Sequence, residues 1–148
     1  MEHIEIMSYG HEWWDKTINF AGNCSWRAGA RLAQRMMNND FDSNEKVIIA
    51  LHDDSIMGFC TFSNKDELPQ EYDFTPFVGF VFVDENYRGK RLSERLVNVA
   101  CDIAKEQNFK KVFIMSGEVG LYEKYGFEKT GNYQTIYGST DQLFCKEV

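Results

Sequence analysis

The sequence predicts an α+β fold in which a central mixed, mostly antiparallel sheet is flanked by helices. Three observations support this prediction. The apolar run Phe77–Val83 continues through a basic turn into an amphipathic helix, a further buried strand follows that helix, and short strands separated by turn residues lie on either side. The predicted element order is β-α-α-β-β-β-α-β-α-β-β. At 148 residues, we expect residues 1–148 to form one domain.

The first third of the chain predicts one strand and two helices. Ile4–Met7 is a short apolar strand. The helix that follows Gly10 has apolar residues at helical spacing, which are Trp14, Ile18 and Ala21, and Gly22-Asn23 ends it. Ser25 is a suitable N-cap for a second helix from Trp26 to about Met37. Its predicted apolar face consists of Trp26, Ala30, Ala33 and Met37.

The middle of the chain predicts a hairpin and a polar loop. Val47–Leu51 and Ile56–Phe62 are apolar runs joined by turn residues. Residues 64–75 then carry four acids against one lysine. This loop is either a solvated connection or an acidic lip that attracts a cationic substrate.

The second half predicts a βαβ unit and a closing hairpin. Phe77–Val83 is expected to be a strand buried on both faces. The helix from Leu92 has its apolar residues at Leu92, Leu96, Val99 and Ile103, and Val112–Met115 returns as a parallel strand. A short helix at Leu121–Tyr125 ends at Gly126. The strands Glu128–Tyr137 and Leu143–Val148 complete the chain.

Composition narrows the function classes. The net charge of −7 argues against binding to nucleic acid or to an anionic membrane. The four cysteines form no CxxC pair and the three histidines show no metal-ligand spacing, so we expect free thiols and no metal. Neither a signal peptide nor an apolar run of roughly 18 residues is present, and we expect a cytoplasmic protein.

The turn Arg88-Gly89-Lys90-Arg91 has the features of a phosphate site. It joins a buried strand to a helix N-terminus, where free N–H groups and the helix dipole favour anions. A solvated helix start is the alternative. The Walker A and GxGxxG patterns are absent, which argues against a nucleoside triphosphatase and a dinucleotide oxidoreductase.

Two segments resemble motifs of the GNAT N-acetyltransferase superfamily. Residues 83–93, VDENYRGKRLS, resemble the family's (Gln/Arg)-x-x-Gly-x-(Gly/Ala) loop for the acetyl-CoA pyrophosphate. Residues 121–127, LYEKYGF, resemble its Leu-Tyr-x-x-x-Gly-Phe segment. The chain departs from the family at Arg91, where glycine is usual, and at Ser93, where glycine or alanine is usual. It also lacks the family's proline before the loop and the asparagine after the next strand.

The resemblance implies acetyl-CoA as co-substrate and assigns roles to particular residues. The backbone of Phe82 and Val83 would pair with the pantetheine arm, and the Val83 N–H would polarise the thioester carbonyl. Tyr122 would be the general acid that protonates the CoA thiolate, with Tyr125 as its competitor and simple packing as the alternative. The pyrophosphate would be held by N–H groups of the loop, from Arg88, Gly89, Lys90, Arg91, Leu92 and Ser93.

The general base and the acceptor are left open by the sequence. The candidate bases are His52, Glu71, Asp73 and Glu118, and a relay of waters is an alternative. Four aromatic residues could line an acceptor pocket or belong to the core: Trp13, Trp14, Phe20 and Trp26. We expect direct attack by a primary amine in a ternary complex, with a non-catalytic CoA-binding module as the rival. The C-terminal strands could mediate a homodimer.

Overall fold

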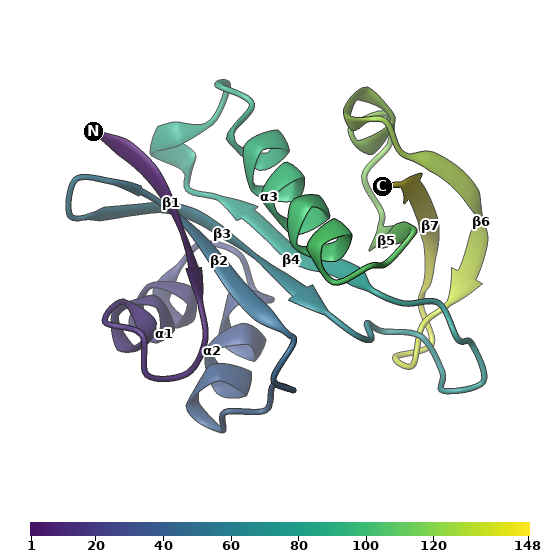
Figure 1. Cartoon of the computed structure of the whole chain (residues 1–148), viewed down its shortest axis with the longest axis horizontal. Helices are drawn as coiled ribbons and strands as arrows, with labels where there is room; N and C mark the ends of the chain where they lie inside the picture. Colours follow the sequence, from purple (N-terminus) through teal and green to yellow (C-terminus); the bar gives the residue numbers. More distant parts are fainter.

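The computed structural model describes residues 1–148 and has a seven-stranded sheet flanked by helices (Figure 1). The strands are β1 (Glu2–Met7), β2 (Lys46–His52), β3 (Ser55–Ser63), β4 (Phe77–Val83), β5 (Lys111–Ser116), β6 (Glu128–Gln134) and β7 (Thr140–Glu147). The helices are α1 (Trp14–Asn23), α2 (Gly29–Met37) and α3 (Leu92–Glu106), with short 3₁₀ turns η1 (Glu85–Tyr87) and η2 (Tyr122–Tyr125). The predicted fold class and element order are confirmed.

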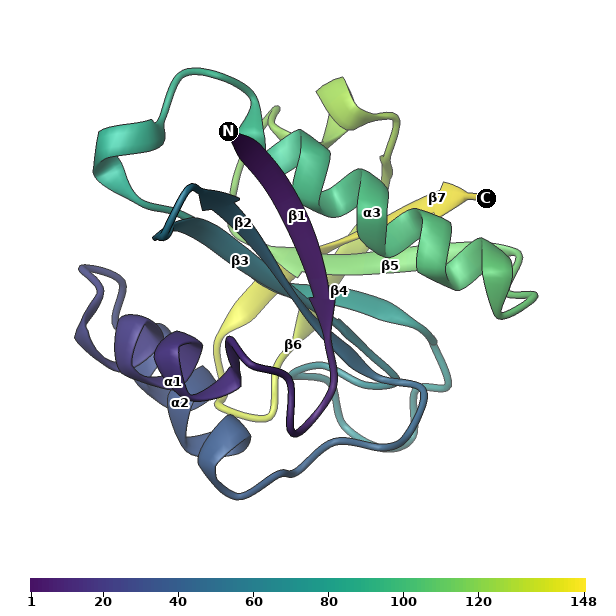
Figure 2. The same cartoon turned by 60° about the vertical axis from the view of Figure 1, so that its left-hand side comes forward.

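The sheet has the order β1-β2-β3-β4-β5-β7-β6, and only β4 and β5 are parallel. Figures 1 and 2 show α3 on one face and α1 and α2 on the other. Each face has its own apolar core. Leu96 and Ala100 of α3 belong to the first core, whereas Ala21 of α1 and Leu32 of α2 belong to the second. Burial of these two faces stabilises the fold.

The sheet opens between β4 and β5. These strands are paired only at Phe77 and Phe113, near the start of β4, and they separate beyond that point. Backbone groups on one edge of β4 are therefore left without a neighbouring strand. An opening of this kind at the carboxyl end of a parallel strand is a common place for a ligand.

A β-bulge shapes β4 at the opening. The register between β3 and β4 shifts between Phe59 and Thr61, and Phe80 has a φ of +48°. Phe80 and Phe82 pack with the α1/α2 core, while Val81 packs with the α3 core. The prediction that β4 is buried on both faces is only partly confirmed, because its middle residues are partly exposed where they line a cleft.

The second helix differs from its prediction. It begins at Gly29 rather than Trp26, and Ser25 does not cap it. The ring of Trp26 stacks on the ring of Phe82 at 5.9 Å between centroids, so the segment before α2 follows the sheet surface instead of continuing the helix. The buried face also differs from the predicted one, since Met37 is 61% exposed. The buried residues of α2 are Gly29, Leu32, Ala33 and Met36.

The loop between β3 and β4 is an ordered wall of the molecule, not only a solvated connection. Phe74 packs on Phe113 of β5 and on Tyr133 of β6, with ring centroids 5.1 and 5.6 Å apart. A buried carboxylate also holds the start of the loop. Glu45, which precedes β2, accepts a 2.8 Å hydrogen bond from the backbone N–H of Asn64. These contacts fix the path of the loop past the opening in the sheet.

Replacing Glu45 with alanine should lower the free energy of unfolding. Glu45 is 7% exposed, lies 3.2 Å from Arg35, and accepts backbone hydrogen bonds from Asp42 and Asn64. Removing the carboxylate leaves two backbone N–H groups and the partly buried guanidinium of Arg35 without this acceptor, which costs about 1–3 kcal/mol. Urea unfolding measures this loss. The matched control is Glu2→Gln, which removes the exposed pair with Arg95 and should leave the midpoint unchanged.

No helix of the structure is both long enough and apolar enough to span a bilayer.

Candidate active site

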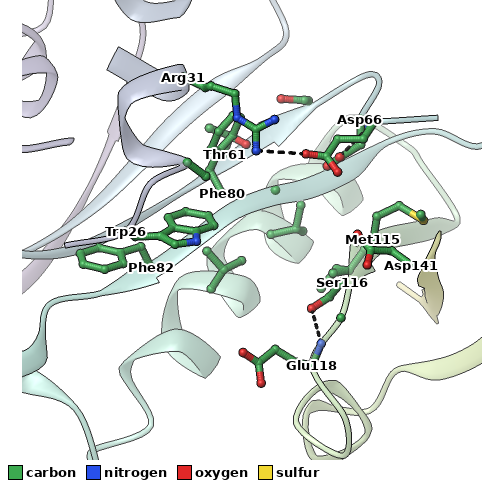
Figure 3. Close-up of a pocket in the computed structure, with 18 of the residues that line it drawn as sticks. Trp26, Arg31, Thr61, Asp66, Phe80, Phe82, Met115, Ser116, Glu118 and Asp141 are labelled. Atoms are coloured by element: carbon green, nitrogen blue, oxygen red, sulfur yellow. Dashed lines mark hydrogen bonds and ion pairs between the residues drawn. The ribbon is translucent and has the colours of Figure 1, made fainter. Parts of the chain in front are cut away.

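A cleft of about 1410 Å³ passes through the opening between β4 and β5. It is lined on one side of the sheet by Arg88 and Ser93, beside the start of α3, and on the other side by Arg31 of α2. Figure 3 shows Arg31, Thr61 and Asp66 toward one end of the cleft, with Ser116 and Glu118 toward the other. The cleft therefore connects the predicted phosphate-binding turn with a pocket beneath α2.

The predicted phosphate-binding turn has the geometry of an anion site. Gly89 and Arg91 have positive φ values of +89° and +56°, and left-handed residues within a turn can direct neighbouring N–H groups toward one point. No side chain caps the N-terminus of α3. Arg88 and Lys90 are exposed and form no ion pair. The turn thus offers free backbone donors and two unpaired cations.

The structure explains why glycine is usual at position 91 of this motif. Arg91 adopts the left-handed conformation, which is unfavourable for residues with a Cβ. Its guanidinium donates to both carboxylate oxygens of Glu94, at 2.8 and 2.9 Å, and lies 5.8 Å from the ring centre of Tyr125. Glu94 therefore already neutralises the charge of the Arg91 side chain.

Replacing Arg91 with glycine should raise thermal stability. The left-handed conformation costs arginine about 1–2 kcal/mol that glycine avoids, which corresponds to a Tm increase of about 2–8 °C in a domain of this size. The loss of the exposed ion pair with Glu94 offsets part of this gain. Calorimetry measures the shift. Arg91→Ala is the control, because it loses the ion pair and keeps the strain, and a Tm as high as that of the glycine variant would contradict the account.

The edge of β4 presents one of the predicted backbone donors to the cleft. The N–H of Asp84 donates to Met57 of β3 at 2.8 Å, and N–H groups alternate in direction along a strand. The N–H of Val83 therefore points away from β3, toward the opening. The Val83 carbonyl is bonded to Nε of Arg88 at 2.9 Å, so a ligand that pairs with this carbonyl must displace Arg88.

The second motif places one tyrosine in the cleft and the other beside it. Tyr122 is 4% exposed and lines the cleft, and burial raises the pKa of its hydroxyl above the ordinary value. The nearby Cys60 and Glu118 raise this pKa further, and Ser116 partly offsets the rise. Tyr125 does not line the cleft; its hydroxyl lies 2.7 Å from that of Ser93.

Asp66 is a titratable group of the cleft that was not singled out from the sequence. It lies in the loop after β3, and burial raises the pKa of its carboxyl to about 7. A 2.6 Å hydrogen bond from the N–H of Glu67 lowers the pKa and limits the rise. The excess of acids in this loop was the only signal in the sequence, and it did not distinguish Asp66 from its neighbours.

The other candidate bases are mostly outside the cleft. Glu118 lines it, beside Ser116, whose hydroxyl accepts a hydrogen bond from the Glu118 N–H at 3.0 Å. Glu71 and Asp73 are exposed in the loop before β4 and do not line the cleft. His52 lies at the end of β2, with its ring 6.4 Å from that of Tyr87. Of the four acids in this loop, Asp66 and Glu67 line the cleft, and Glu71 and Asp73 do not.

One of the four aromatic candidates lines the cleft. Trp26 lies against Phe80 and Phe82 at the wall of the pocket (Figure 3). Trp14 is a core residue, 3% exposed, whose indole N–H donates to the Met36 carbonyl. The remaining two, Trp13 and Phe20, pack at the edge of the α1/α2 core.

The far wall of the pocket is closed by contacts between distant segments. Arg31 of α2 pairs with Glu67 at 3.4 Å and lies 5.1 Å from the ring centre of Tyr137, in the turn between β6 and β7. The N–H of Ile136 donates to the Glu67 carbonyl at 2.7 Å. These contacts join α2, the loop before β4 and the C-terminal hairpin around one end of the cleft. No group of three or more His, Cys, Asp or Glu residues could hold a metal ion.

Comparison with protein families identifies the chain. Residues 9–127 match the sequence profile described as the Acetyltransferase (GNAT) family. The chain belongs to the GNAT acetyltransferase family. This match covers the predicted phosphate-binding turn and the segment that contains Tyr122. A comparison with curated proteins found no match.

Solved structures have the same fold at low sequence identity. The GNAT family acetyltransferase from Elizabethkingia anophelis with acetyl-CoA bound aligns with a TM-score of 0.69 and 16% identity over 99% of this chain and 98% of that one. Aminoglycoside 6'-acetyltransferase type Ii aligns with a TM-score of 0.73 and 16% identity over 98% and 96%. A proposed phosphinothricin N-acetyltransferase aligns with a TM-score of 0.69 and 16% identity over 99% of each chain. At this identity the likeness establishes the GNAT fold alone.

Proposed function

We propose that this GNAT protein is an acetyl-CoA-dependent N-acetyltransferase that transfers an acetyl group to a primary amine by direct attack in a ternary complex. The observation that carries the proposal is the continuous cleft, which leads from the turn at α3 past Tyr122 to the carboxylate of Asp66. A phosphate site, an acid and a base along one cleft are the parts that this reaction needs. Acetyl-CoA would supply the acetyl group as a thioester, as the co-substrate of a protein located in the cytoplasm.

The turn at α3 fits the phosphates of this co-substrate. The N–H groups of residues 88–93 and the side chains of Arg88 and Lys90 would hold the pyrophosphate. Moving Arg88 to the phosphates would also free the Val83 carbonyl, to which it is bonded, for the pantetheine arm. Phe82 and Val83 would then pair with this arm as an added strand at the open edge of β4.

Val83 and Tyr122 would act on the thioester. The N–H of Val83 would donate to the carbonyl oxygen as negative charge develops there. The amine nitrogen forms a bond to the carbonyl carbon, the carbon–sulfur bond breaks, and Tyr122 donates its proton to the departing sulfur. A raised pKa keeps the Tyr122 hydroxyl protonated at neutral pH, so a proton is available for this step.

Asp66 is our proposed general base. The amine must lose a proton as its nitrogen bonds to carbon, and a carboxylate with a pKa of about 7 is half ionised at neutral pH. Asp66 lies on the α2 side of the sheet, beside Gly79 of the bulge, where the Arg31 end of the cleft would receive the acceptor. Glu118 is the alternative base, and a relay of waters without either carboxylate is the third candidate.

Co-substrate binding is tested by the shift in Tm on addition of acetyl-CoA. A ligand that binds only the folded state raises the stability, by about 2.7 kcal/mol at 100 times its Kd. We expect acetyl-CoA and CoA to raise the Tm, and adenosine to have no comparable effect because it lacks the pyrophosphate and the pantetheine arm. No stabilisation by acetyl-CoA or by CoA would contradict the proposal.

A non-catalytic CoA-binding module is the second candidate function. It is favoured by one observation, that Arg91 and Ser93 replace the small residues usual in the loop and commit their side chains to Glu94 and Tyr125. Such a module would be stabilised by CoA and would release no thiol in the presence of amines.

A further inference from the structure

The two residues at which the phosphate-binding turn departs from the family's pattern both lie against Tyr125. The hydroxyl of Ser93, on the first turn of α3, is 2.7 Å from the hydroxyl of Tyr125 on η2. The guanidinium of Arg91 lies 5.8 Å from the centre of the same ring. Glycine or alanine, which are usual at position 93, have no hydroxyl and could not form the Ser93–Tyr125 hydrogen bond.

A count of hydroxyl protons shows which residue is the donor in this hydrogen bond. The two hydroxyls carry two protons and share one hydrogen bond, and neither has another partner in the protein, so one proton is left over. Tyr125 is 6% exposed and does not line the cleft, so a proton left over on its hydroxyl would be buried without an acceptor. Ser93 lines the cleft, where a ligand or water can accept its proton. The arrangement of lower energy therefore has Tyr125 as donor, the Ser93 oxygen as acceptor, and the Ser93 proton directed to the cleft.

The Ser93 proton lies among other donors that have no partner. The first N–H groups of α3 have no side-chain cap. Arg88 lines the same cleft, and neither Arg88 nor Lys90 forms an ion pair. A ligand at this turn must accept hydrogen bonds from N–H groups, from cationic side chains and from a hydroxyl. The oxygens of a pyrophosphate are acceptors of this kind.

We propose that Ser93 is an additional binding residue for acetyl-CoA, and that its hydroxyl, oriented by Tyr125, donates a hydrogen bond to an oxygen of the pyrophosphate. The inference rests on the proposed function, which assigns the pyrophosphate to this turn, and it adds a side-chain contact to those of the backbone. Tyr125 does not touch the ligand. It is a positioning residue, because it occupies the Ser93 oxygen and leaves the Ser93 proton for the phosphate.

A purely structural role of the pair predicts different behaviour in three variants. Ser93→Ala leaves the buried Tyr125 hydroxyl without an acceptor and should lower the Tm. Tyr125→Phe leaves Ser93 facing the cleft and should lower the Tm less. The double variant, Ser93→Ala with Tyr125→Phe, leaves no unpaired hydroxyl and should have a Tm close to that of the wild type. A structural role would restore CoA affinity together with the Tm, whereas a binding role would not.

The test measures the Kd of CoA by isothermal titration calorimetry for the wild type and the three variants. Ser93→Ala should raise the Kd about tenfold or more, because it removes a hydrogen bond to a charged group. The double variant should bind CoA as weakly as Ser93→Ala does, although its Tm is restored. Tyr125→Phe should raise the Kd about threefold, because the Ser93 hydroxyl then has three staggered positions instead of one. Dephospho-CoA keeps the pyrophosphate and lacks the 3′-phosphate, so Ser93→Ala should weaken its binding by the same factor.

The outcomes separate this inference from the proposed function. A double variant with the wild-type Kd for CoA overturns the inference and leaves the proposed function standing. A double variant that stays as unstable as Ser93→Ala contradicts the direction assigned to the hydrogen bond, and the inference fails with it. A loss of affinity for CoA that is absent for dephospho-CoA moves the contact to the 3′-phosphate and overturns the assignment to the pyrophosphate. A wild type that does not bind CoA overturns the proposed function as well.

Discussion

Tyr122→Phe should lower kcat by about 100-fold while leaving acetyl-CoA binding nearly unchanged. A positioned general acid contributes typically 10²–10⁴-fold, and phenylalanine removes only the hydroxyl that would protonate the sulfur. The ring itself packs against Tyr125, Phe127 and Phe144, so phenylalanine keeps the buried contacts and the fold. The measurement is the steady-state rate of CoA release, together with the Tm shift produced by acetyl-CoA.

Tyr125→Phe is the matched control on the same turn. It removes a hydroxyl that lies 2.7 Å from that of Ser93, on a tyrosine that does not line the cleft, and should change kcat by less than Tyr122→Phe does. If Tyr122→Phe keeps full activity, the acid assignment is wrong. If the tyrosine at position 125 proves to be the one required, the acid would act from the side of Ser93 and not from the cleft wall.

Asp66→Asn should lower kcat by 100-fold or more and at the same time stabilise the protein above neutral pH. Asparagine keeps the size of the side chain and can still accept the hydrogen bond from the N–H of Glu67, but it cannot take a proton from the amine. In the wild type, kcat/KM should rise with pH through about 7, as the carboxyl of the free enzyme ionises, and then level off. In the variant this limb of the profile should be absent.

The effect on stability follows from the direction of the pKa shift. The folded-state pKa of Asp66 is raised from 3.8 to about 7, so between these values the folded protein holds a proton that the unfolded chain releases. The free energy of unfolding therefore falls as pH rises through this window, by at most about 4 kcal/mol, and stays low above it. Asp66→Asn removes this loss. Urea unfolding at pH 5 and pH 8 should show its largest stabilisation at pH 8.

Glu118→Gln is the control for the assignment of the base. Glu118 lines the same cleft from the other side, and its replacement should leave the pH profile unchanged. A profile that loses its acidic limb in Glu118→Gln and keeps it in Asp66→Asn would move the base to Glu118. A loss of activity in Asp66→Asn with no gain in stability at pH 8 would contradict the burial of an ionised Asp66.

The sequence was sufficient to predict the fold and the position of the basic turn between β4 and α3. The apolar run of β4, the basic turn and the spacing of α3 are local features, and each occurs in the structure at the predicted place. The left-handed residue at Arg91 even gives the physical reason for the glycine usual there. These elements were predictable because strand, turn and helix are adjacent in the chain.

The acceptor side was not predictable in the same way, since it depends on contacts between distant segments. Asp66 approaches Gly79 only because the loop before β4 is held at Asn64 by Glu45 and packs on β5 and β6 through Phe74. The buried hydroxyl of Thr61 has no hydrogen-bond partner, and this too becomes visible only once its neighbours are placed. The predicted start of α2 at Trp26 was wrong for a similar reason. Trp26 stacks on the sheet, and the helix begins only at Gly29.

The most direct test of the proposed reaction is to incubate the protein with acetyl-CoA and a panel of primary amines, and to measure released CoA thiol and N-acetylated amine together. We predict thiol release that depends on a primary amine, with one N-acetylated product formed for each thiol and with both signals lost in Asp66→Asn. Stabilisation by acetyl-CoA with no amine-dependent thiol release across a panel of alkylamines, diamines, amino sugars and peptides would contradict catalysis and would leave a CoA-binding module.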